Sequence, residues 1–462
     1  MSIAGRLGLL LLTSSVVALA ILVTPGPTAA APERPNIVVI MVDDLAEMDT
    51  RVWSRLRHID ARFVRRGLRF TRAIGETPRC CPGRANFLTG LHTDDHGVIE
   101  NNGRRLDPTS TIATELRDAG YFTFIAGKYM NDTSLIRDKK PAGWNRTAIT
   151  DGSYHDYTMW VNGMAERHGS SVADYSTDVA RRRALAFLRA APPRKPVFAF
   201  VTPFAPHAAT ANTPFPMPAR RHVGAAACQG IAPWRPPNYN EADVSDKPRA
   251  VQDRLLRPYR AGWPLTEICE SLLSVDEMFG AIVDELRRQG RLRNTLFMLT
   301  SDNGMAFGSH RLVAKDNPYS VRVPLVVSWI AGRGSAPGRT SYPVSNIDIA
   351  PTLCHVGGCL MGPFREQATA DGESFLPTIR GRDQHVRRAL LERGSGTAPW
   401  WGVRTTHADP LGRWHYVEHP TGERELYDLD EDPWEMKSLD GQPRSAAVEA
   451  ALASRLDRLR RR

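Results

Sequence analysis

Four continuous apolar runs along the chain end in polar or ionisable residues. The runs are NIVVIMV, YFTFIAG, PVFAFVTPFAP and TLFMLTS, and the residues that follow them are Asp43 and Asp44, Lys128, His207, and Asp302 and Asn303. Runs of Val, Ile, Leu and Phe predict buried strands. Because parallel strands present their carboxyl ends at one edge of a sheet, where ligands bind, we expect these polar side chains to gather there.

Amphipathic segments separate the apolar runs. TIATELRDAG, VADYSTDVARRRALAFLRAA and SLLSVDEMFGAIVDELRRQG carry apolar residues three or four positions apart, which predicts helices. Strands and helices in alternation predict an α/β fold with a large, mostly parallel central sheet and helices on both faces. Residues 208–248 are rich in Pro, Ala and Asn and predict a long loop that shapes a pocket.

The pattern changes from about residue 371. WWGVRTT, GRWHYVEH and RELYDLDEDPWEMKSL alternate over short stretches, and a helical segment follows from about Ser445. Short alternating stretches predict a small antiparallel sheet, here closed by a helix. The sequence therefore predicts a large domain over residues 32–370 and a C-terminal subdomain over residues 371–462.

The first 31 residues have the pattern of a cleavable secretory signal. Arg6 precedes an apolar run over residues 7–23, and small residues lead up to Ala31. A short membrane anchor is the alternative, but the run barely reaches spanning length and ends in Pro25 and Pro27. We expect an exported chain, secreted or held in the cell envelope (lysosomal in a eukaryote), with no stable membrane insertion after the signal is removed.

Lys and Arg number 60 against 50 Asp and Glu, which gives a formal charge of +10. A basic surface suits anionic partners. The basic residues are scattered, with their tightest run in the terminal LDRLRRR, so we expect no nucleic-acid binding.

The chain has six cysteines. In an exported protein Cys354 and Cys359 could close a small loop, and Cys228 with Cys269 could form a second disulfide. These pairings leave the adjacent Cys80 and Cys81.

The stretch TPRCCPGRANFLTG places those two cysteines before a predicted helix. Pro82 suits the first turn of a helix, so Cys80 would lie at its N-terminus, where free N–H groups and the helix dipole favour an anion and acidify a thiol. A small buried cysteine is the alternative. A zinc site is disfavoured because no second Cys or His lies at zinc-like spacing.

The acidic residues after the apolar runs have two readings. Asp43-Asp44 and Asp302-Asn303 are each, taken alone, a good turn or helix-cap sequence. Placed at one sheet edge, three carboxylates and an amide oxygen make a hard site that suits Ca²⁺ or Mg²⁺.

Cys80-Cys81-Pro82-Gly83-Arg84, followed by Leu88-Thr89-Gly90, resembles the Cys-x-Pro-x-Arg signature of type I sulfatases, whose cysteine is oxidised to formylglycine (3-oxoalanine). Only Cys80 has the proline and the arginine at the required spacing. The resemblance continues through NIVVIMVDDL, GKYMN, APHA, SVDE, TSDNG, RVPL, IDIAPTL and ELYDLDEDPWE, and is greatest to the N-acetylglucosamine-6-sulfatase-like branch. It implies an alkaline-phosphatase-like sandwich that cleaves sulfate monoesters, either sulfated sugars or aryl sulfates, and is matured by a formylglycine-generating enzyme.

The resemblance also implies roles for individual residues. Calcium, with magnesium as the alternative, would be held by Asp43, Asp44, Asp302, Asn303 and the modified Cys80. Arg84 and Lys128 would neutralise and orient the hydrated formylglycine. Lys315 and His207 would bind the sulfate, and one of them would protonate the leaving oxygen.

The chain departs from the family pattern at four positions. Gly83 stands where many sulfatases have Ser, Met130 where others have a sulfate-binding His, Ser309 where this branch has Glu, and Ala314 where Gly is common. At Met130 one sulfate or diol contact is either missing or supplied elsewhere, and His310 is the candidate substrate-binding residue for the second case.

Two other functions stay open at this stage. A phosphonate or phosphodiester hydrolase could use the same scaffold, and an unmodified Cys80 would leave a binder of sulfated glycans. Asn131 and Asn145 head glycosylation sequences that would be used only in a eukaryotic secretory pathway.

Overall fold

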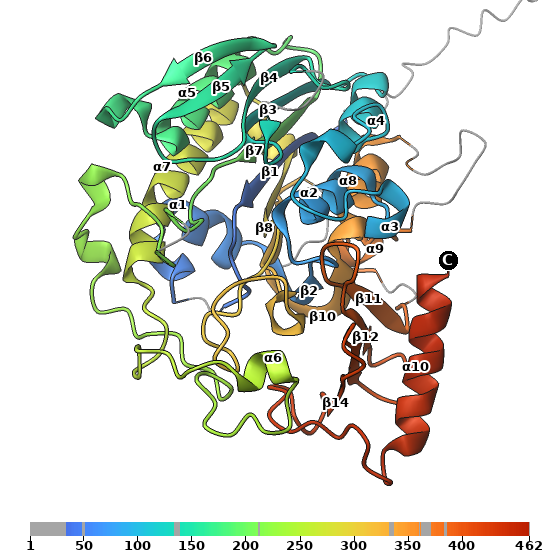
Figure 1. The fold of residues 1–462 in the computed structure, drawn as a ribbon. Helices are drawn as coiled ribbons and strands as arrows, with labels where there is room; N and C mark the ends of the chain where they lie inside the picture. Colours follow the sequence, from blue (N-terminus) through green and yellow to red (C-terminus); the bar gives the residue numbers. More distant parts are fainter. Residues whose placement is uncertain are drawn as a thin grey trace, which may run out of the picture. The chain divides into compact units, whose positions relative to one another are not determined.

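A ten-stranded sheet with the order β10-β2-β9-β8-β1-β7-β3-β4-β5-β6 forms the centre of this computed structural model (Figure 1). The structure describes residues 34–48, 51–133, 139–210, 213–331, 337–359, 361, 371–382 and 386–461. The strands are β1 (Asn36–Val42), β2 (Leu68–Ile74), β3 (Phe122–Lys128), β4 (Arg146–Thr150), β5 (Tyr157–Val161), β6 (Met164–His168), β7 (Val197–Thr202), β8 (Thr295–Ser301), β9 (Leu325–Trp329) and β10 (Gly338–Ser345).

The four apolar runs form the adjacent strands β8, β1, β7 and β3 at the centre of this sheet. These strands and β4 run parallel, whereas β9, β5 and β6 run antiparallel to their neighbours. Val42 at the end of β1 pairs with Ser301 at the end of β8, so Asp43 and Asp302 begin side by side. This register confirms the mostly parallel sheet and sets up the polar edge.

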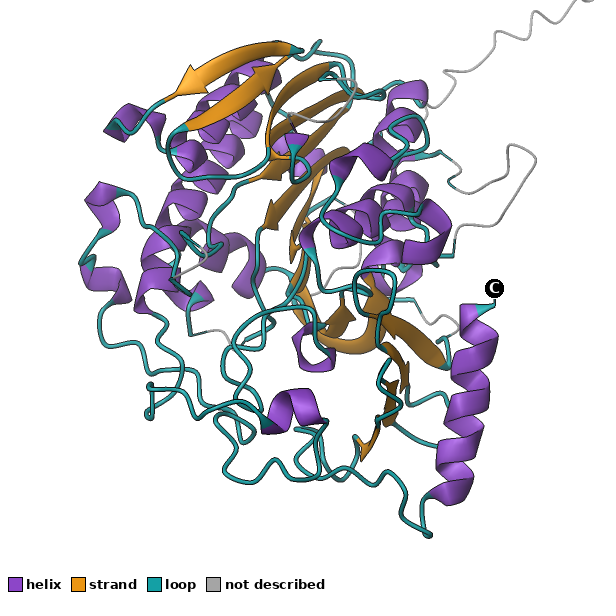
Figure 2. Cartoon of the chain, in the orientation of Figure 1, coloured by secondary structure: helices purple, strands orange, loops and turns teal. Residues whose placement is uncertain are grey.

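Helices cover both faces of the sheet (Figure 2). α5 (Ser176–Arg189) and α7 (Thr266–Arg288) pack with Val38, Ile40 and Val42 of β1. The alternate residues of β1 point to the other face, where they pack with α2 (Cys80–Thr89), α4 (Ile112–Asp118) and α8 (Ile349–Gly357). The three helices predicted from apolar spacing are confirmed. Short helices complete the main part: α1 (Arg57–Ile59), α3 (Thr93–His96), α6 (Arg249–Gln252) and α9 (Leu376–Ile379).

The C-terminal part contains a second, antiparallel sheet. Its strands are β11 (Ala389–Arg393), β12 (Trp401–Thr405), β13 (Trp414–Glu418) and β14 (Arg424–Asp428), and α10 (Ala446–Arg460) packs on it through Leu452 and Leu456. The predicted small sheet and closing helix are confirmed, and β11 is a strand that the sequence did not indicate. The domain boundary at residue 371 stays a prediction.

The two predicted disulfides are present, Cys228 to Cys269 and Cys354 to Cys359. Cys80 and Cys81 are free and buried. Among the residues that the structure describes, no helix is long and apolar enough to cross a membrane. The predicted signal, residues 1–31, lies outside the described residues.

A buried histidine in the small sheet makes stability depend on pH. His415 Nε2 lies 3.1 Å from Glu392 Oε2, and its Nδ1 lies 2.9 Å from Glu435 Oε1. Burial and Arg404 lower the pKa of His415, but the two carboxylates more than offset them and raise it from 6.5 to about 9. Because the folded pKa exceeds the unfolded one, this stabilisation is complete below about pH 6.5 and is lost as pH rises through 9.

We therefore expect the free energy of unfolding to fall by roughly 3 kcal/mol through this residue between pH 6.5 and 9.5. Urea denaturation across this range should show a shallower pH slope for His415→Gln than for the parent chain. His355→Gln, at an exposed position, is the control and should keep the parent slope. An unchanged slope in His415→Gln would contradict the assignment.

Candidate active site

Helix α2 places Cys80 at the polar edge of the large sheet. Arg79 is the extended N-cap residue, with φ −147° and ψ 143°, so Cys80 is the first residue of the helix and Pro82 lies in its first turn. The side chain of Cys80 is 1% exposed. The predicted position at a helix N-terminus is confirmed.

Two carboxylates and an imidazole surround this thiol. Cys80 Sγ lies 3.8 Å from Asp43 Oδ1 and 4.0 Å from Asp44 Oδ1, and one donor atom from each of Cys80, Asp43, Asp44 and His207 lies within 4.8 Å of the others. Asp44 has a left-handed φ of 61°, a strained conformation that Asp tolerates better than most residues. Its N–H donates to Asp302 Oδ1 at 3.1 Å, which holds the strained residue in place.

Four cationic side chains contact the thiol and the carboxylates. Lys315 Nζ lies 2.8 Å from Cys80 Sγ and also pairs with Asp44. The other three pairs are Lys128 Nζ with Asp43 Oδ2 at 2.7 Å, Arg84 Nε with Asp302 Oδ2 at 2.9 Å, and His207 Nε2 with Asp44 Oδ2 at 3.2 Å. The structure thus brings together every predicted catalytic and metal-binding residue. We call this set of nine residues the Cys80 cluster: Asp43, Asp44, Cys80, Arg84, Lys128, His207, Asp302, Asn303 and Lys315.

The ionisation of the cluster follows from burial and close charges. Burial raises the pKa of Asp43, but Lys128 and the other cations outweigh it and hold that pKa far below its usual range. Burial and the charge of Asp43 raise the pKa of Asp302 to about 6. Burial lowers the pKa of His207, but Asp43 and Asp44 more than offset it and raise it to about 9. At neutral pH four cations therefore face three carboxylates, a balance that attracts an anion.

The same residues fit a divalent cation. Asn303 Oδ1 is buried and has no hydrogen-bond partner, while its amide nitrogen donates to Asp44 Oδ1 at 2.8 Å. An orphaned amide oxygen beside carboxylates matches the oxygen ligands of Ca²⁺ or Mg²⁺. His207, protonated at neutral pH, is better suited to pair with Asp44 than to ligate a metal.

His310 lies outside the Cys80 cluster. Its ring is fully buried, with Nδ1 2.5 Å from Glu241 Oε2 and Nε2 3.2 Å from the amide nitrogen of Asn238. The ring also packs against Tyr319, with 4.2 Å between centroids. Because both nitrogens are engaged, the structure gives the predicted substrate contact of His310 no support. Met130 is buried in the hydrophobic cluster around α2 and takes no polar role.

Cys81 differs from its neighbour in chemistry as well as in position. Its Sγ accepts the N–H of Asn131 at 3.2 Å, and burial raises its pKa to about 12. A thiol that stays protonated is a poor nucleophile. The assignment of Cys80 as the reactive cysteine therefore agrees with the geometry.

A cavity of about 350 Å³ opens beside Lys315. Residues from distant parts of the chain line it, including Arg254 and Arg257 after α6 and Trp400 and His419 from the C-terminal part. The sequence did not indicate these residues, because no local pattern shows that the small sheet reaches the cluster. The only signal was the Pro-rich loop, which was expected to shape a pocket.

Gly83 lies where helix α2 touches the end of β8. A Cβ at this position would come 2.2 Å from the backbone oxygen of Asp302. Replacing a glycine within a helix by alanine normally stabilises the protein. Here we expect Gly83→Ala to cost about 1–3 kcal/mol, because the helix must move away from Asp302.

Urea denaturation of Gly83→Ala measures this cost. Gly338→Ala, whose Cβ would meet no atom within 4 Å, is the matched control and should be neutral. A Gly83→Ala chain as stable as the control would show that the contact of α2 with Asp302 is loose.

Comparison with known proteins identifies the family. The family model described as Sulfatase matches residues 35–359, and the model described as N-sulphoglucosamine sulphohydrolase, C-terminal, matches residues 308–462. The N-acetylglucosamine-6-sulfatase of Capra hircus is 30% identical over 385 residues, which cover 76% of this chain but only 65% of the goat protein. The arylsulfatase of Volvox carteri is 30% identical over an alignment of 511 positions, which covers 95% of this chain and 77% of the algal protein.

A solved structure described as a complex with its substrate D-glucosamine-2-N,6-O-disulfate superposes with a TM-score of 0.74 at 22% identity. The match covers 93% of this chain and 98% of that chain, and it confirms the alkaline-phosphatase-like α/β fold. The family model over most of the chain, together with the Volvox relative, shows that this chain belongs to the sulfatase family.

Proposed function

We propose that this chain hydrolyses sulfate monoesters, with a formylglycine formed from Cys80 as the nucleophile and Ca²⁺ as the metal. One observation carries the proposal: the Cys80 side chain meets Lys315 Nζ at 2.8 Å and two carboxylates within 4.0 Å in a cluster with excess positive charge. A sulfate ester is an anion, so its binding and its transition state need such cations.

Each cationic residue has a task that follows from its position. Arg84 and Lys128 are buried against Asp43 and Asp302, so they fix the carboxylates and hold charge near Cys80. Lys315 and His207 are only half-buried and lie nearer the solvent, where an incoming sulfate would meet them. His207 Nδ1 donates to the Ala208 oxygen at 2.8 Å, so the proton for the leaving oxygen would be the one on Nε2, which faces Asp44 Oδ2 at 3.2 Å inside the Cys80 cluster.

A formylglycine at residue 80 and a calcium ion would complete this arrangement. A hydrated aldehyde at residue 80 supplies one hydroxyl for attack on sulfur and a second whose deprotonation releases the sulfate. Asp43, Asp44, Asp302 and Asn303 would hold a calcium ion that stabilises negative charge on the reacting oxygens. Unmodified, the Cys80 Sγ marks where the aldehyde oxygen would lie.

The alcohol part of the substrate would occupy the cavity beside Lys315. Its lining combines Arg254, Arg257 and His419 with two aromatic side chains, Tyr319 and Trp400, a mixture that suits a sugar better than a plain aryl group. The names of the goat relative and of the superposed complex point the same way. We propose a 6-sulfated glucosamine derivative as the substrate.

We also propose that the chain works outside the cytoplasm, after modification of Cys80 by a formylglycine-generating enzyme. The apolar N-terminal segment supports export, and the two disulfides suit an oxidising compartment.

A substrate panel tests the reaction. Protein produced with a converting enzyme should hydrolyse 4-nitrophenyl sulfate and N-acetylglucosamine 6-sulfate, and a calcium chelator should abolish both activities. Faster turnover of the matching phosphonate or phosphodiester would overturn the sulfatase assignment. Failure to act on any of these esters with a fully converted Cys80 would favour a binding protein.

A further inference from the structure

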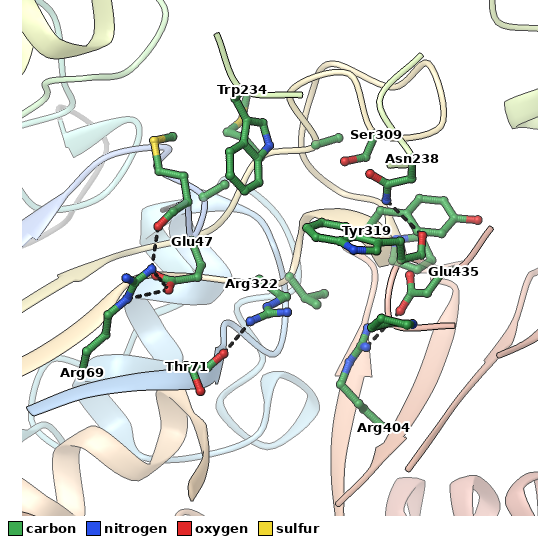
Figure 3. A pocket seen from close by; sticks show the side chains of 18 of the residues that line it. Glu47, Arg69, Thr71, Trp234, Asn238, Ser309, Tyr319, Arg322, Arg404 and Glu435 are labelled. Carbon is green, nitrogen blue, oxygen red and sulfur yellow. Dashed lines mark hydrogen bonds and ion pairs between the residues drawn. The ribbon is translucent and has the colours of Figure 1, made fainter. Parts of the chain in front are cut away.

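A second, separate cavity of about 370 Å³ lies between the β2–β9 end of the large sheet and the C-terminal part (Figure 3). Phe70 of β2 packs in the hydrophobic cluster of α2, so Arg69 and Thr71 on the same strand project to the opposite face and line this cavity. No member of the Cys80 cluster lines it. Pro318 and Tyr319 line both cavities, so the two share one wall.

Arginines outnumber acids in the lining. Arg69, Arg322, Arg339 and Arg404 face two carboxylates, Glu47 and Glu435. Glu47 pairs with Arg69, and Glu435 with Arg404 at 2.9 Å. Figure 3 shows Arg69, Arg322 and Arg404 along one side of the cavity.

The other two arginines are the surplus. Arg322 donates to the neutral carbonyl of Thr71, and Arg339 is exposed. Within the described ranges neither forms a close ion pair, although the charge of Glu47 acts on both and that of Glu435 on Arg322. With four arginines and two glutamates, the lining keeps an excess of two positive charges.

The positive lining continues into an adjoining cavity of about 70 Å³. It shares Arg322 and Arg404 with the larger cavity and adds Arg72 and Arg413. Arg413 pairs with Asp430 at 2.9 Å, whereas Arg72, in the part of the chain that the structure describes, forms no close ion pair and feels Asp430 only at longer range. Burial, and then the charge of Arg413, lowers the pKa of Arg72. A bound oxyanion would relieve this repulsion.

The opposite wall is suited to a sugar ring. The rings of Trp234 and Trp434 lie 6.4 Å apart between centroids at 60°, and Trp434 is 37% exposed. Asn238 is 6% exposed, and its Oδ1 has no partner while its nitrogen donates to the Trp434 carbonyl at 3.1 Å. Figure 3 shows Trp234, Asn238 and Ser309 facing the arginines across the cavity. An orphaned acceptor beside aromatic faces matches a hydroxyl-bearing ring.

We propose that this cavity is a second binding site, which holds a sulfate- or carboxylate-bearing sugar unit of a polyanionic saccharide. Its volume is within the range of small-molecule sites, and its arginines bind oxyanions through paired N–H donors. The choice of a saccharide rests on the proposed function. A site that holds one unit of a chain raises the local concentration of the others near the Cys80 cluster.

Equilibrium binding to the full chain tests the site. The background is Cys80→Ala, which prevents turnover, and the probe is a heparin-derived tetrasaccharide measured by calorimetry at several salt concentrations. Arg339→Glu should weaken binding at least roughly tenfold and make it less salt-dependent, and Trp434→Ala should weaken it by a similar factor. The matched control is Arg293→Glu, at an exposed arginine in the turn Leu292–Asn294 before β8, which should bind as the background does.

Three outcomes would overturn the proposal. The first is that Arg339→Glu and Arg293→Glu weaken tetrasaccharide binding equally. The second is that neither Arg339→Glu nor Trp434→Ala weakens it. The third is that the tetrasaccharide binds no more tightly than inorganic sulfate. The proposed sulfatase function is tested separately, by measuring 4-nitrophenyl sulfate turnover by the chain with Cys80 intact. Arg339→Glu should leave that turnover within about twofold, since the small ester does not reach the second cavity.

Discussion

Cys80→Ala is expected to reduce turnover of 4-nitrophenyl sulfate by roughly four to six orders of magnitude, the effect of deleting a catalytic nucleophile. Alanine cannot be converted to an aldehyde, so neither the attacking hydroxyl nor the group that releases sulfate can form. The remaining cations would still bind the ester. The loss should therefore appear in kcat, with little change in KM.

The neighbouring cysteine provides the matched control. Cys81 is equally buried but accepts a backbone N–H from Asn131 and faces away from the carboxylates. Cys81→Ala should keep turnover within about threefold and cost about 1 kcal/mol of stability, the cost of a small buried deletion. Equal loss of turnover in the two variants would mean that the distortion of α2, and not chemistry at Cys80, causes it.

Arg84→Met is expected to lower the free energy of unfolding by about 3–5 kcal/mol. Arg84 is fully buried, pairs with Asp302 and Asp43, and donates to the Lys128 carbonyl at 2.6 Å. Its removal leaves two buried carboxylates with less compensation, and Asp302 already has a pKa raised to about 6. Activity should fall as well, because the same arginine fixes the acidic residues.

Urea denaturation in metal-free buffer measures this effect. Arg287→Met removes an exposed helix pair with Asp284 and should change stability by less than about 0.5 kcal/mol. If Arg84→Met changed the free energy of unfolding as little as this control does, the ion pairs of Arg84 would not be what stabilises the Cys80 cluster.

Local sequence predicted the part of the fold that is buried on both faces. β1, β3, β7 and β8 are continuous apolar runs because helices cover them on each side. β2 was not indicated, because Arg69, Thr71 and Arg72 interrupt its apolar residues. Those polar residues line the arginine-rich cavities. The residues that interrupt the apolar pattern of β2 are therefore residues that line the proposed second binding site and the cavity beside it.

Edge strands were missed for a similar reason. The edge strand β6 (MAERH) is exposed or half-buried along its length and carries no apolar alternation. Without a buried face, a strand leaves no periodic signal.

The candidate site was predictable where it depends on strand ends and on the signature. Asp43 and Asp302 are the residues directly after the ends of the paired strands β1 and β8, so the apolar runs were enough to place them. The prediction for His310 was not supported, because the sequence does not show which residue its ring contacts. Glu241, about 70 residues earlier in the chain, forms a hydrogen bond with His310 Nδ1. The cavity beside Lys315 is likewise formed by segments that only the tertiary fold brings together.

The mass of the peptide that contains Cys80, taken from protein that turns over sulfate esters, tests the central claim most directly. The account predicts that residue 80 has lost its sulfur and gained an oxygen, as the aldehyde or its hydrate, while Cys81 in the same peptide remains a thiol. An intact thiol at residue 80 in fully active protein would contradict it.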